Sequence, residues 1–302
     1  MLFPGDASRQ GRHAGAYNPR SGHRGRIITI LIILAVVCLL AYPFIEPYLL
    51  ETETVSLTAD DFPSAIGQLR VVYVSDIHAG GTFTQSRVKD LISRINACNA
   101  DLVLLGGDYA DSSTAAVRFF EELPRIYSRY GVYAVVGNHD RTMPESNLTT
   151  LKNAMLSAGV TPLVNAVQRV RIGTSDIVLA GIDDINNGYP DLAGVAKQVS
   201  VDDYVIFLCH SPGIIPDAIR AVDSTGRGSW FDLGLFGHTH GGQIAFLESI
   251  VDTNGVPARY ESGWLRENRI DMLVSHGVGT SNLPVRFLCR PQIHVITIKP
   301  DT

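Results

Sequence analysis

Short apolar segments that end in aspartate, asparagine or histidine recur along this chain of 302 residues, and they constrain its fold more than any other feature. Segments that are apolar throughout are typical of strands buried on both faces, in a sheet that helices cover. The carboxyl ends of such strands meet at one edge of the sheet, where open α/β folds place their sites. We therefore expect these polar residues to gather at that edge: Asp76 and His78 after 69–74, Asp108 after 101–106, Asn138 and His139 after 131–136, His210 after 204–209, and His238 and His240 after 232–236.

The segments between these strands have helical spacing. Apolar residues recur at that spacing over 88–95 and 148–155, and Gly159 follows the second run as a helix stop. After His240 the pattern changes: apolar and polar residues alternate over 292–298, which predicts a strand of a second, mixed sheet. An α/β fold is therefore expected, with helices packed against its sheets.

The composition is that of an ordinary globular chain without a basic domain. Hydrophobic residues make up 45% and charged residues 18% of it, and the formal net charge is -5. These values fit one domain of roughly 250 residues with a short extra segment. A nucleic-acid-binding domain would carry a basic surface, so no nucleic-acid partner is expected. The four cysteines have no metal-type spacing, and no disulfide pairing follows from their positions.

The start of the chain divides into three parts. Residues 1–25 are rich in Gly, Arg, Ser and His without an apolar period, which predicts disorder. The apolar run that begins at Ile27 and is counted on to Ile45 is about as long as the minimum bilayer span of roughly 17–20 residues, which predicts a transmembrane anchor over residues 26–45. Residues 46–66 have the composition of a polar connector, so the globular domain is expected to cover residues 67–302.

Three other interpretations of the apolar run are weaker. A cleaved signal peptide would have small residues at its cleavage site, and the residues from Ala41 to Phe44 do not provide them. A lipoprotein anchor at Cys38 would have a small residue before the cysteine, where Val37 stands. A buried core helix is not expected directly behind five arginines, so an uncleaved anchor is favoured.

Five short motifs occur in a fixed order in the middle of the chain. They are Asp76-x-His78, Gly107-Asp108-x-x-Asp111, Gly137-Asn138-His139-Asp140, a lone His210, and Gly237-His238-x-His240. In order and spacing this set resembles the calcineurin-like metallophosphoesterases. The resemblance implies a four-layer α-β-β-α sandwich of two mixed sheets and a binuclear metal centre.

The chemistry of phosphate ester hydrolysis explains these residue types. Water must attack in line with the leaving oxygen, on which negative charge builds. Two divalent ions roughly 3.5–4 Å apart can activate the water and clamp the phosphoryl oxygens. Such a pair needs a bridging carboxylate and a surrounding shell of imidazoles and carboxylates. The mixed nitrogen and oxygen set favours two transition-metal ions, Mn first, with Fe, Zn or Co as alternatives.

The resemblance also implies a role for each motif residue. The first ion would be held by Asp76, His78 and His240 and the second by Asn138, His210 and His238, with Asp108 bridging them. His139 would protonate the leaving oxygen or steady the phosphoryl group. Asp111 would orient His139 through its other ring nitrogen. Asp140 is expected to be structural.

Features outside these motifs bear on the substrate. Ser112 stands where the protein Ser/Thr phosphatases have an arginine that grips phosphate, which argues against a phosphoprotein substrate. The chain also resembles a membrane-linked bacterial subfamily, that of the YkuE-type phosphoesterases and one class of UDP-2,3-diacylglucosamine hydrolase. This second resemblance rests on the anchor and on residues 181–184, 237–243 and 277–286. Arg286 and Arg290 are candidate phosphate-binding residues, because a guanidinium matches phosphate in a bidentate fashion.

These features predict a phosphoesterase that cleaves a phosphodiester or diphosphate bond in an amphiphilic, lipid-linked or envelope substrate. A UDP-2,3-diacylglucosamine hydrolase of the lipid A pathway is one specific candidate, and a general phosphomonoesterase is an alternative. A non-catalytic scaffold of the same fold is another alternative. It would show gaps in the metal shell or a replaced His139, and the sequence has neither.

The anchor is expected to cross the cytoplasmic membrane once, with the globular domain outside. Five arginines precede it and acidic residues follow it, so the positive-inside rule keeps the amino terminus in the cytoplasm. Alkaline phosphatase fused after Thr302 should therefore be active, and a fluorescent protein fused there should be dark. The opposite pair of results would place the domain in the cytoplasm, where UDP-linked lipid precursors are found.

Overall fold

A computed structural model describes residues 19–142, 145–244 and 256–301. The chain divides into two compact units, Met1–Tyr42 and Pro43–Thr302. The disorder predicted for residues 1–25 falls outside the described residues up to residue 18. From Pro19 onward the chain is already helical, so that part of the prediction was wrong.

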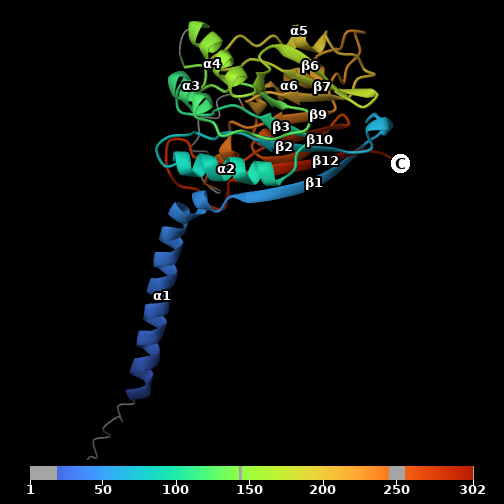
Figure 1. Cartoon of the computed structure of the whole chain (residues 1–302). Coiled ribbons are helices and arrows are strands. Elements are labelled where there is room, and N and C mark those ends of the chain that lie inside the picture. The colour runs from blue at the N-terminus through green and yellow to red at the C-terminus, as the bar shows by residue number, and fades with distance from the viewer. Residues whose placement is uncertain (1–18, 143–144, 245–255, 302) are drawn as a thin grey trace, which may run out of the picture. The chain divides into compact units, whose positions relative to one another are not determined.

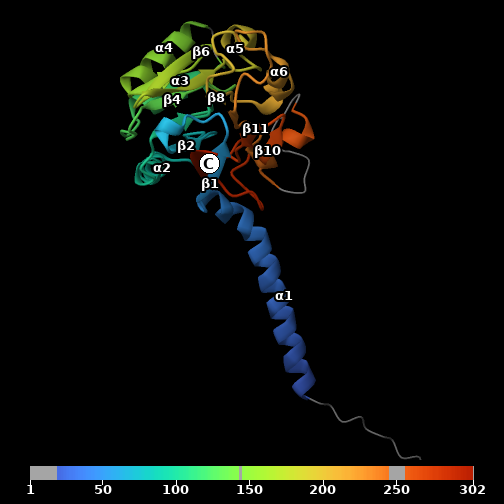
Figure 2. The ribbon, with the colours of Figure 1, turned by 90° about the vertical axis from the view of Figure 1, so that its right-hand side faces the viewer.

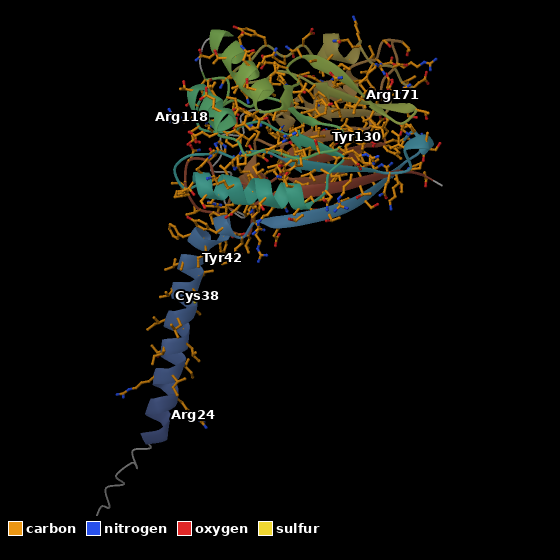
Figure 3. The ribbon with its side chains drawn as sticks, viewed as in Figure 1. Arg24, Cys38, Tyr42, Arg118, Tyr130 and Arg171 are labelled. Atoms are coloured by element: carbon orange, nitrogen blue, oxygen red, sulfur yellow. The ribbon has the colours of Figure 1, made fainter. Side chains whose placement is uncertain are left out.

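The predicted anchor is a single long helix. Helix α1 covers Pro19–Ile45, and the stretch Arg24–Tyr48 contains a window of 18 residues that has a mean hydropathy of 2.9 and is not buried in the protein. Its side chains are exposed from Arg24 to Ala41, as Figure 3 shows for Arg24 and Cys38. Within the described residues it is the one helix long and apolar enough to cross a membrane.

The second unit is built on two six-stranded mixed sheets (Figure 1). The first sheet has the order β1 (Glu51–Ala59), β12 (Gln292–Pro300), β2 (Leu69–Val74), β3 (Leu102–Leu105), β4 (Val132–Ala134) and β5 (Val160–Pro162). The second has the order β10 (Gly263–Glu267), β11 (Ile270–Val274), β9 (Leu233–Phe236), β8 (Val205–Leu208), β7 (Ser175–Gly181) and β6 (Ala166–Ile172). Each is mixed, because β12 runs antiparallel to β2, and β10 and β6 run antiparallel to their neighbours.

Helices cover the outer face of each sheet, which confirms the four-layer sandwich. The first sheet is covered by α2 (Gln85–Ala97), α3 (Ser113–Glu121) and α4 (Glu145–Ser157), and the second by α5 (Leu192–Ala196) and α6 (Ile215–Arg220). Figure 2 shows α2, α3 and α4 on one side of the paired sheets and α6 on the other. Short 3-10 turns occur at Glu46–Tyr48, Ser64–Ile66, Pro212–Ile214, His240–Gly242 and Ala258–Tyr260.

The burial of β2 on both faces follows from the apolar run Val71–Val74. Successive side chains of a strand point to opposite faces of the sheet. Val71 and Tyr73 therefore enter the core between the two sheets, and Val72 and Val74 enter the core beneath the helices. All four are completely buried. A strand covered on both sides can present polar groups only at its ends, and this places the candidate ligands.

Two predictions about strands were wrong. Residues 46–66 are not a connector, because β1 lies within them and pairs in parallel with β12 along nine residue positions. Leu57 and Ala59 turn toward the core between the sheets, whereas the alternate residues are exposed. Residues 292–298 form β12, which belongs to the first sheet and lies between β1 and β2. The compact unit accordingly begins at Pro43 and not at residue 67.

A buried carboxylate ties the start of this unit to its end. Glu46 is completely buried, and its two carboxylate oxygens accept hydrogen bonds from the amides of Leu288 (2.7 Å) and Cys289 (2.8 Å). A buried charge is tolerated only with such partners. Glu46 therefore holds the segment before β12 against the segment before β1.

Removing this carboxylate should destabilise the domain. Glu46→Ala leaves two amides without their acceptor, which should cost about 2–4 kcal/mol in the free energy of unfolding. Glu51→Ala is the control, because the Glu51 carboxylate pairs with Arg290 where both side chains are about half exposed. It should cost less than about 1 kcal/mol. Denaturant unfolding of both variants in detergent measures the difference, and equal losses would contradict the assignment.

Candidate metal centre

The carboxyl ends of five strands bring the predicted ligands together. The strands β2, β3, β4, β8 and β9 are followed by Asp76 and His78, Asp108, Asn138, His210, and His238 and His240. Six of these side chains form groups whose ligand atoms lie within 4.8 Å of one another. The groups are Asp76–His78–His240, Asp108–His210–His238 and His78–Asp108–His139. Residue groups that could hold metal ions are thus present at the predicted edge.

The first group has the geometry of a cation site. The Nε2 atoms of His78 and His240 lie 3.1 Å apart, and His240 Nε2 lies 3.5 Å from a carboxylate oxygen of Asp76. All three side chains are buried. Two neutral imidazoles facing each other can share one proton between their lone pairs at most. A cation bound by both nitrogens and the carboxylate satisfies all three groups, so the donor set fits a metal ion.

The second group shares Asp108 with the first. An Asp108 oxygen lies 3.1 Å from His210 Nε2 and 3.7 Å from His78 Nε2, so it lies between the two groups. His210 Nδ1 donates to the Gly106 carbonyl at 2.8 Å. With the proton on Nδ1, the lone pair of His210 is on Nε2, which faces the cluster. No hydrogen-bond donor among the described residues contacts this Nε2 atom. This is the orientation that a metal-ligating imidazole requires.

Asn138 completes the second group. Its side-chain oxygen lies 2.9 Å from His238 Nδ1. An amide oxygen is a neutral ligand, so it adds a donor without adding to the negative charge of Asp108. Behind it, the Asn187 side chain donates to the Asn138 carbonyl at 2.9 Å and fixes that part of the chain.

Asp140 holds the loops after β3 and β4 together. Its carboxylate accepts from the amides of Gly137 (2.9 Å), Asp108 (2.8 Å) and Tyr109 (3.1 Å). Asp108 in turn accepts from the His139 amide at 2.9 Å. Asp140 is buried and directed away from the ligand atoms into the backbone, which agrees with the structural role expected for it.

The backbone is strained at five of the ligand positions. The φ angles are 53° at Asp76, 46° at His78, 54° at Asp108, 72° at His238 and 52° at His240. These lie in the left-handed region, which costs a non-glycine residue about 1–2 kcal/mol. Strain of this kind persists where the surroundings hold a functional group in place.

Two glycines of the motifs are required by close approach to the ligands. A Cβ on Gly137 would lie 2.2 Å from an oxygen of Asp108. A Cβ on Gly237 would lie 2.4 Å from an oxygen of Asp76. Any larger residue at either position would displace a carboxylate, so both positions need glycine.

Charges within the buried cluster compensate one another. Burial raises the pKa of Asp76. Burial also opposes the charge on Asp108, but the neighbouring His210 and His78 outweigh it and hold the pKa of Asp108 well below its usual range. The Asp108 and Asp76 carboxylates likewise outweigh burial at His210 and raise its pKa. Burial and the neighbouring His78 lower the pKa of His240, which favours a neutral imidazole. Without a metal, a proton on His210 offsets part of the negative charge that a cation would neutralise.

Residues 69–242, more than half of the chain, match the family described as calcineurin-like phosphoesterase. The chain belongs to this family. It is 29% identical over 262 residues to the metallophosphoesterase YkuE of Bacillus subtilis, covering 85% of this chain and 88% of that protein. A metallophosphoesterase of Aquifex aeolicus is 29% identical over 277 residues, which cover 86% of this chain and 95% of that protein. A Danio rerio transmembrane protein with a metallophosphoesterase domain is 28% identical over 287 residues, covering 90% of this chain and 62% of that protein.

The chain belongs to this family, and its sheet edge carries residue groups that could hold metal ions. It is therefore a metal-dependent phosphoester hydrolase. A cavity of about 240 Å³ opens onto the cluster. It is lined by Asp108, Asn138, His139, His238, His240, Ser281 and Asn282. His139 is only partly buried, and its ring packs edge-on against His78 with 4.9 Å between centroids.

The structure places Asp111 differently from the prediction. Its carboxylate accepts from His78 Nδ1 at 2.9 Å, so it orients a candidate metal ligand and not His139. The reason is the turn after β3, which carries Asp111 past the end of β2. The hydrogen bond and nearby carboxylates outweigh the effect of burial and raise the pKa of His78. With Nδ1 engaged in this way, Nε2 of His78 faces the cluster.

Neither of the two predicted phosphate-binding arginines lines the cavity, although the Arg286 guanidinium lies 3.4 Å from His240 Nδ1, behind the cluster. Arg286 is completely buried, and its guanidinium donates to the carbonyls of Gly279 (2.6 Å), His276 (2.7 Å) and Cys289 (3.1 Å). It cannot reach phosphate in this arrangement and serves as a brace. Arg290 forms an ion pair with Glu51 at the β1 edge of the first sheet. The phosphate-binding role of Arg286 was therefore wrong in this structure, and that of Arg290 stays a prediction.

A supporting loop after β7 did not receive a firm role from the sequence. Asp184 accepts from the amides of Asn186 (2.9 Å) and Asn187 (2.6 Å), and this orders the loop whose Asn187 contacts Asn138. Asp183 pairs with Arg141 at 3.1 Å, with both side chains buried. The signal was available, because β7 also ends abruptly in carboxylates.

The position of Asp111 leads to a prediction about metal affinity. Asp111→Asn removes the carboxylate that orients His78, and losing such a partner typically weakens metal binding about 10–100-fold. Mn²⁺ titration by calorimetry measures the change. Asp217→Asn, an exposed carboxylate on α6 paired with Arg220, is the control and should bind as the parent does. Unchanged affinity in Asp111→Asn would contradict the role.

Proposed function

We propose that this chain hydrolyses a phosphodiester or diphosphate bond in an amphiphilic, lipid-linked or envelope substrate at the cytoplasmic membrane. The observation that carries the proposal is that the candidate metal groups lie together beside one cavity, whose wall includes Asp108, His238, His240 and His139. A non-catalytic scaffold would have no need for a full set of buried, strained ligands. A UDP-2,3-diacylglucosamine-type lipid is the specific candidate substrate in the opposite topology, in which the domain would face the cytoplasm, where UDP-linked lipid precursors are found.

The ligand roles follow the two groups. Asp76, His78 and His240 would hold one divalent ion, and Asn138, His210 and His238 a second, with Asp108 between them. Manganese is the first choice, with Fe, Zn or Co as alternatives, because imidazole and carboxylate donors occur together. When bound, the two ions would supply a nucleophilic water and neutralise charge on the phosphoryl oxygens.

His139 would serve as the proton donor. It lies on the cavity wall, partly exposed, and its amide is held by Asp108. Its proton would go to the leaving oxygen as the ester bond breaks. Asp111 contacts His78 and not His139. The hydrogen bond of the His139 amide to Asp108 and the packing of its ring against His78 would therefore position the proton donor.

The membrane setting supports an amphiphilic substrate. Helix α1 is long and apolar enough to span a bilayer, and one relative is itself named a transmembrane protein. An anchored site meets substrates in the membrane far more often than soluble ones. We propose a single-pass protein with the domain on the extracytoplasmic side, where the substrate would be an envelope lipid or polymer.

A comparison of leaving groups tests this function. In detergent with Mn²⁺, the protein should hydrolyse two diesters: bis(4-nitrophenyl) phosphate, whose leaving group is nitrophenolate, and a dialkyl phosphate, whose leaving group is an alkoxide. His139→Gln should keep its metal and lose roughly 10²–10⁴-fold in kcat on the alkyl diester, the usual contribution of general acid catalysis. The loss should be smaller for the nitrophenyl ester, since nitrophenolate leaves without a proton.

His238→Gln is the matched control for that experiment. It should lose a metal ion and fail equally on both substrates, because it removes a ligand of the second group. Elemental analysis beside kcat separates the two variants. Loss of metal from His139→Gln would make this residue a ligand, and a chain with no turnover of any phosphoester at full metal content would refute the proposed function.

A further inference from the structure

One loop, Ser281–Leu288, connects the cavity to the start of the domain. At its beginning, Ser281 and Asn282 line the cavity. Gln243, buried just beyond His240, clamps this part of the loop: it accepts from the Ser281 amide at 2.9 Å and donates to the Leu283 carbonyl at 2.8 Å. The loop is therefore a fixed wall of the site.

The other end of the loop contacts the segment where the apolar span ends. The Arg286 amide donates to the Pro43 carbonyl at 3.0 Å, and the Leu288 amide donates to the Glu46 carboxylate at 2.7 Å. The apolar stretch that can span a membrane ends at Tyr48. Groups hydrogen-bonded to Pro43 and Glu46 therefore lie beside the carboxyl end of this apolar stretch.

The same two segments expose large apolar side chains. The exposed fractions are 51% for Leu283 and 57% for Leu288 on the loop, and 58% for Tyr48 and 37% for Leu49 beside it. Leu288 also has a φ of 53°, a left-handed conformation that leucine rarely adopts. This turn directs the Leu288 and Cys289 amides to Glu46 while the leucine side chain stays outside.

Two arginines border this apolar group. Arg87 donates to the Pro47 carbonyl at 2.5 Å and lies over the Tyr48 ring at 4.5 Å. Arg94 donates to the Leu50 carbonyl at 3.2 Å. Basic side chains beside exposed leucine and tyrosine are the combination that favours an interface with anionic lipid headgroups.

We infer that the loop Ser281–Leu288 is a membrane-docking edge of the metal site, with Leu283 and Leu288 inserted in the bilayer interface. The occupant of this surface is lipid, because the loop is hydrogen-bonded to Pro43 and Glu46, where the apolar stretch ends. A cavity wall that also touches the bilayer brings the metal groups next to phosphate esters whose apolar tails remain in the membrane. This last step rests on the proposed function, whereas the docking itself does not.

Tryptophan quenching tests the docking. The full chain is reconstituted in vesicles of phosphatidylglycerol and phosphatidylcholine, with or without brominated acyl chains. Leu283→Trp and Leu288→Trp should each lose fluorescence in the brominated vesicles relative to the plain ones. Leu156→Trp is the matched control, because Leu156 is 56% exposed and lies on α4, away from β1 in Figures 1 and 2. It should show no loss beyond that of the parent chain.

A second measurement uses a pair of substrates that share one leaving group. A phosphodiester with a long alkyl chain is embedded in the vesicles, and its methyl analogue is dissolved in the buffer. In Leu283→Asp/Leu288→Asp, kcat/KM on the embedded ester should fall about 10–100-fold, since misplacement of bound groups by about 1 Å has effects of this size. Turnover of the methyl ester should stay unchanged, which shows that the variant is folded.

The outcomes separate the two hypotheses. Absence of quenching at both leucines overturns the docking, even if both esters are hydrolysed. A blue shift without quenching that grows with protein density assigns this surface to a second copy of the chain and also overturns it. Quenching without turnover of either ester supports the docking while refuting the proposed function.

Discussion

The structure depends on keeping two carboxylates, Asp76 and Asp108, inside a protein core. Both are almost fully buried, and they follow strands whose buried side chains are apolar. Such charges are tolerated only when cations or donors surround them. The histidines that converge from other strands provide part of this compensation, and bound metal ions would provide the rest. The left-handed backbone at five ligand positions is a second cost, which the rigid two-sheet core absorbs.

Each ligand is held by a different support. His210 is fixed by a backbone carbonyl, His78 by the Asp111 carboxylate, and the loop of Asp108 by Asp140. These supports come from strand ends and turns that are far apart in the sequence. The arrangement makes the centre stiff, and a stiff centre selects metal ions by coordination geometry as well as by donor type.

The sequence predicted which side chains gather at the sheet edge better than it predicted what holds them there. An apolar strand followed by Asp76 is visible without a structure, because burial on both faces forces a strand to be apolar throughout. The partner of Asp111 was not predictable, because it depends on how the turn after β3 approaches His78. Arg286 was misjudged for a related reason: a buried arginine and a surface arginine look alike in a sequence. The β1 strand could have been found, since its apolar residues at Val55 and Leu57 alternate with polar ones.

The pairing of β1 with β12 has a consequence for how the protein is made. Glu46 and the amide of Leu288 are 242 residues apart in the sequence. The first segment of the domain can therefore form its native contacts only after nearly the last segment has been synthesised. A chain interrupted before β12 leaves β1 without a neighbour and opens the edge of β2, because β12 lies between them. Open strand edges and unpaired buried groups mark a chain as unfinished. Proteases that degrade incomplete chains can therefore recognise a chain truncated before β12 by the missing pairing of β1 with β12.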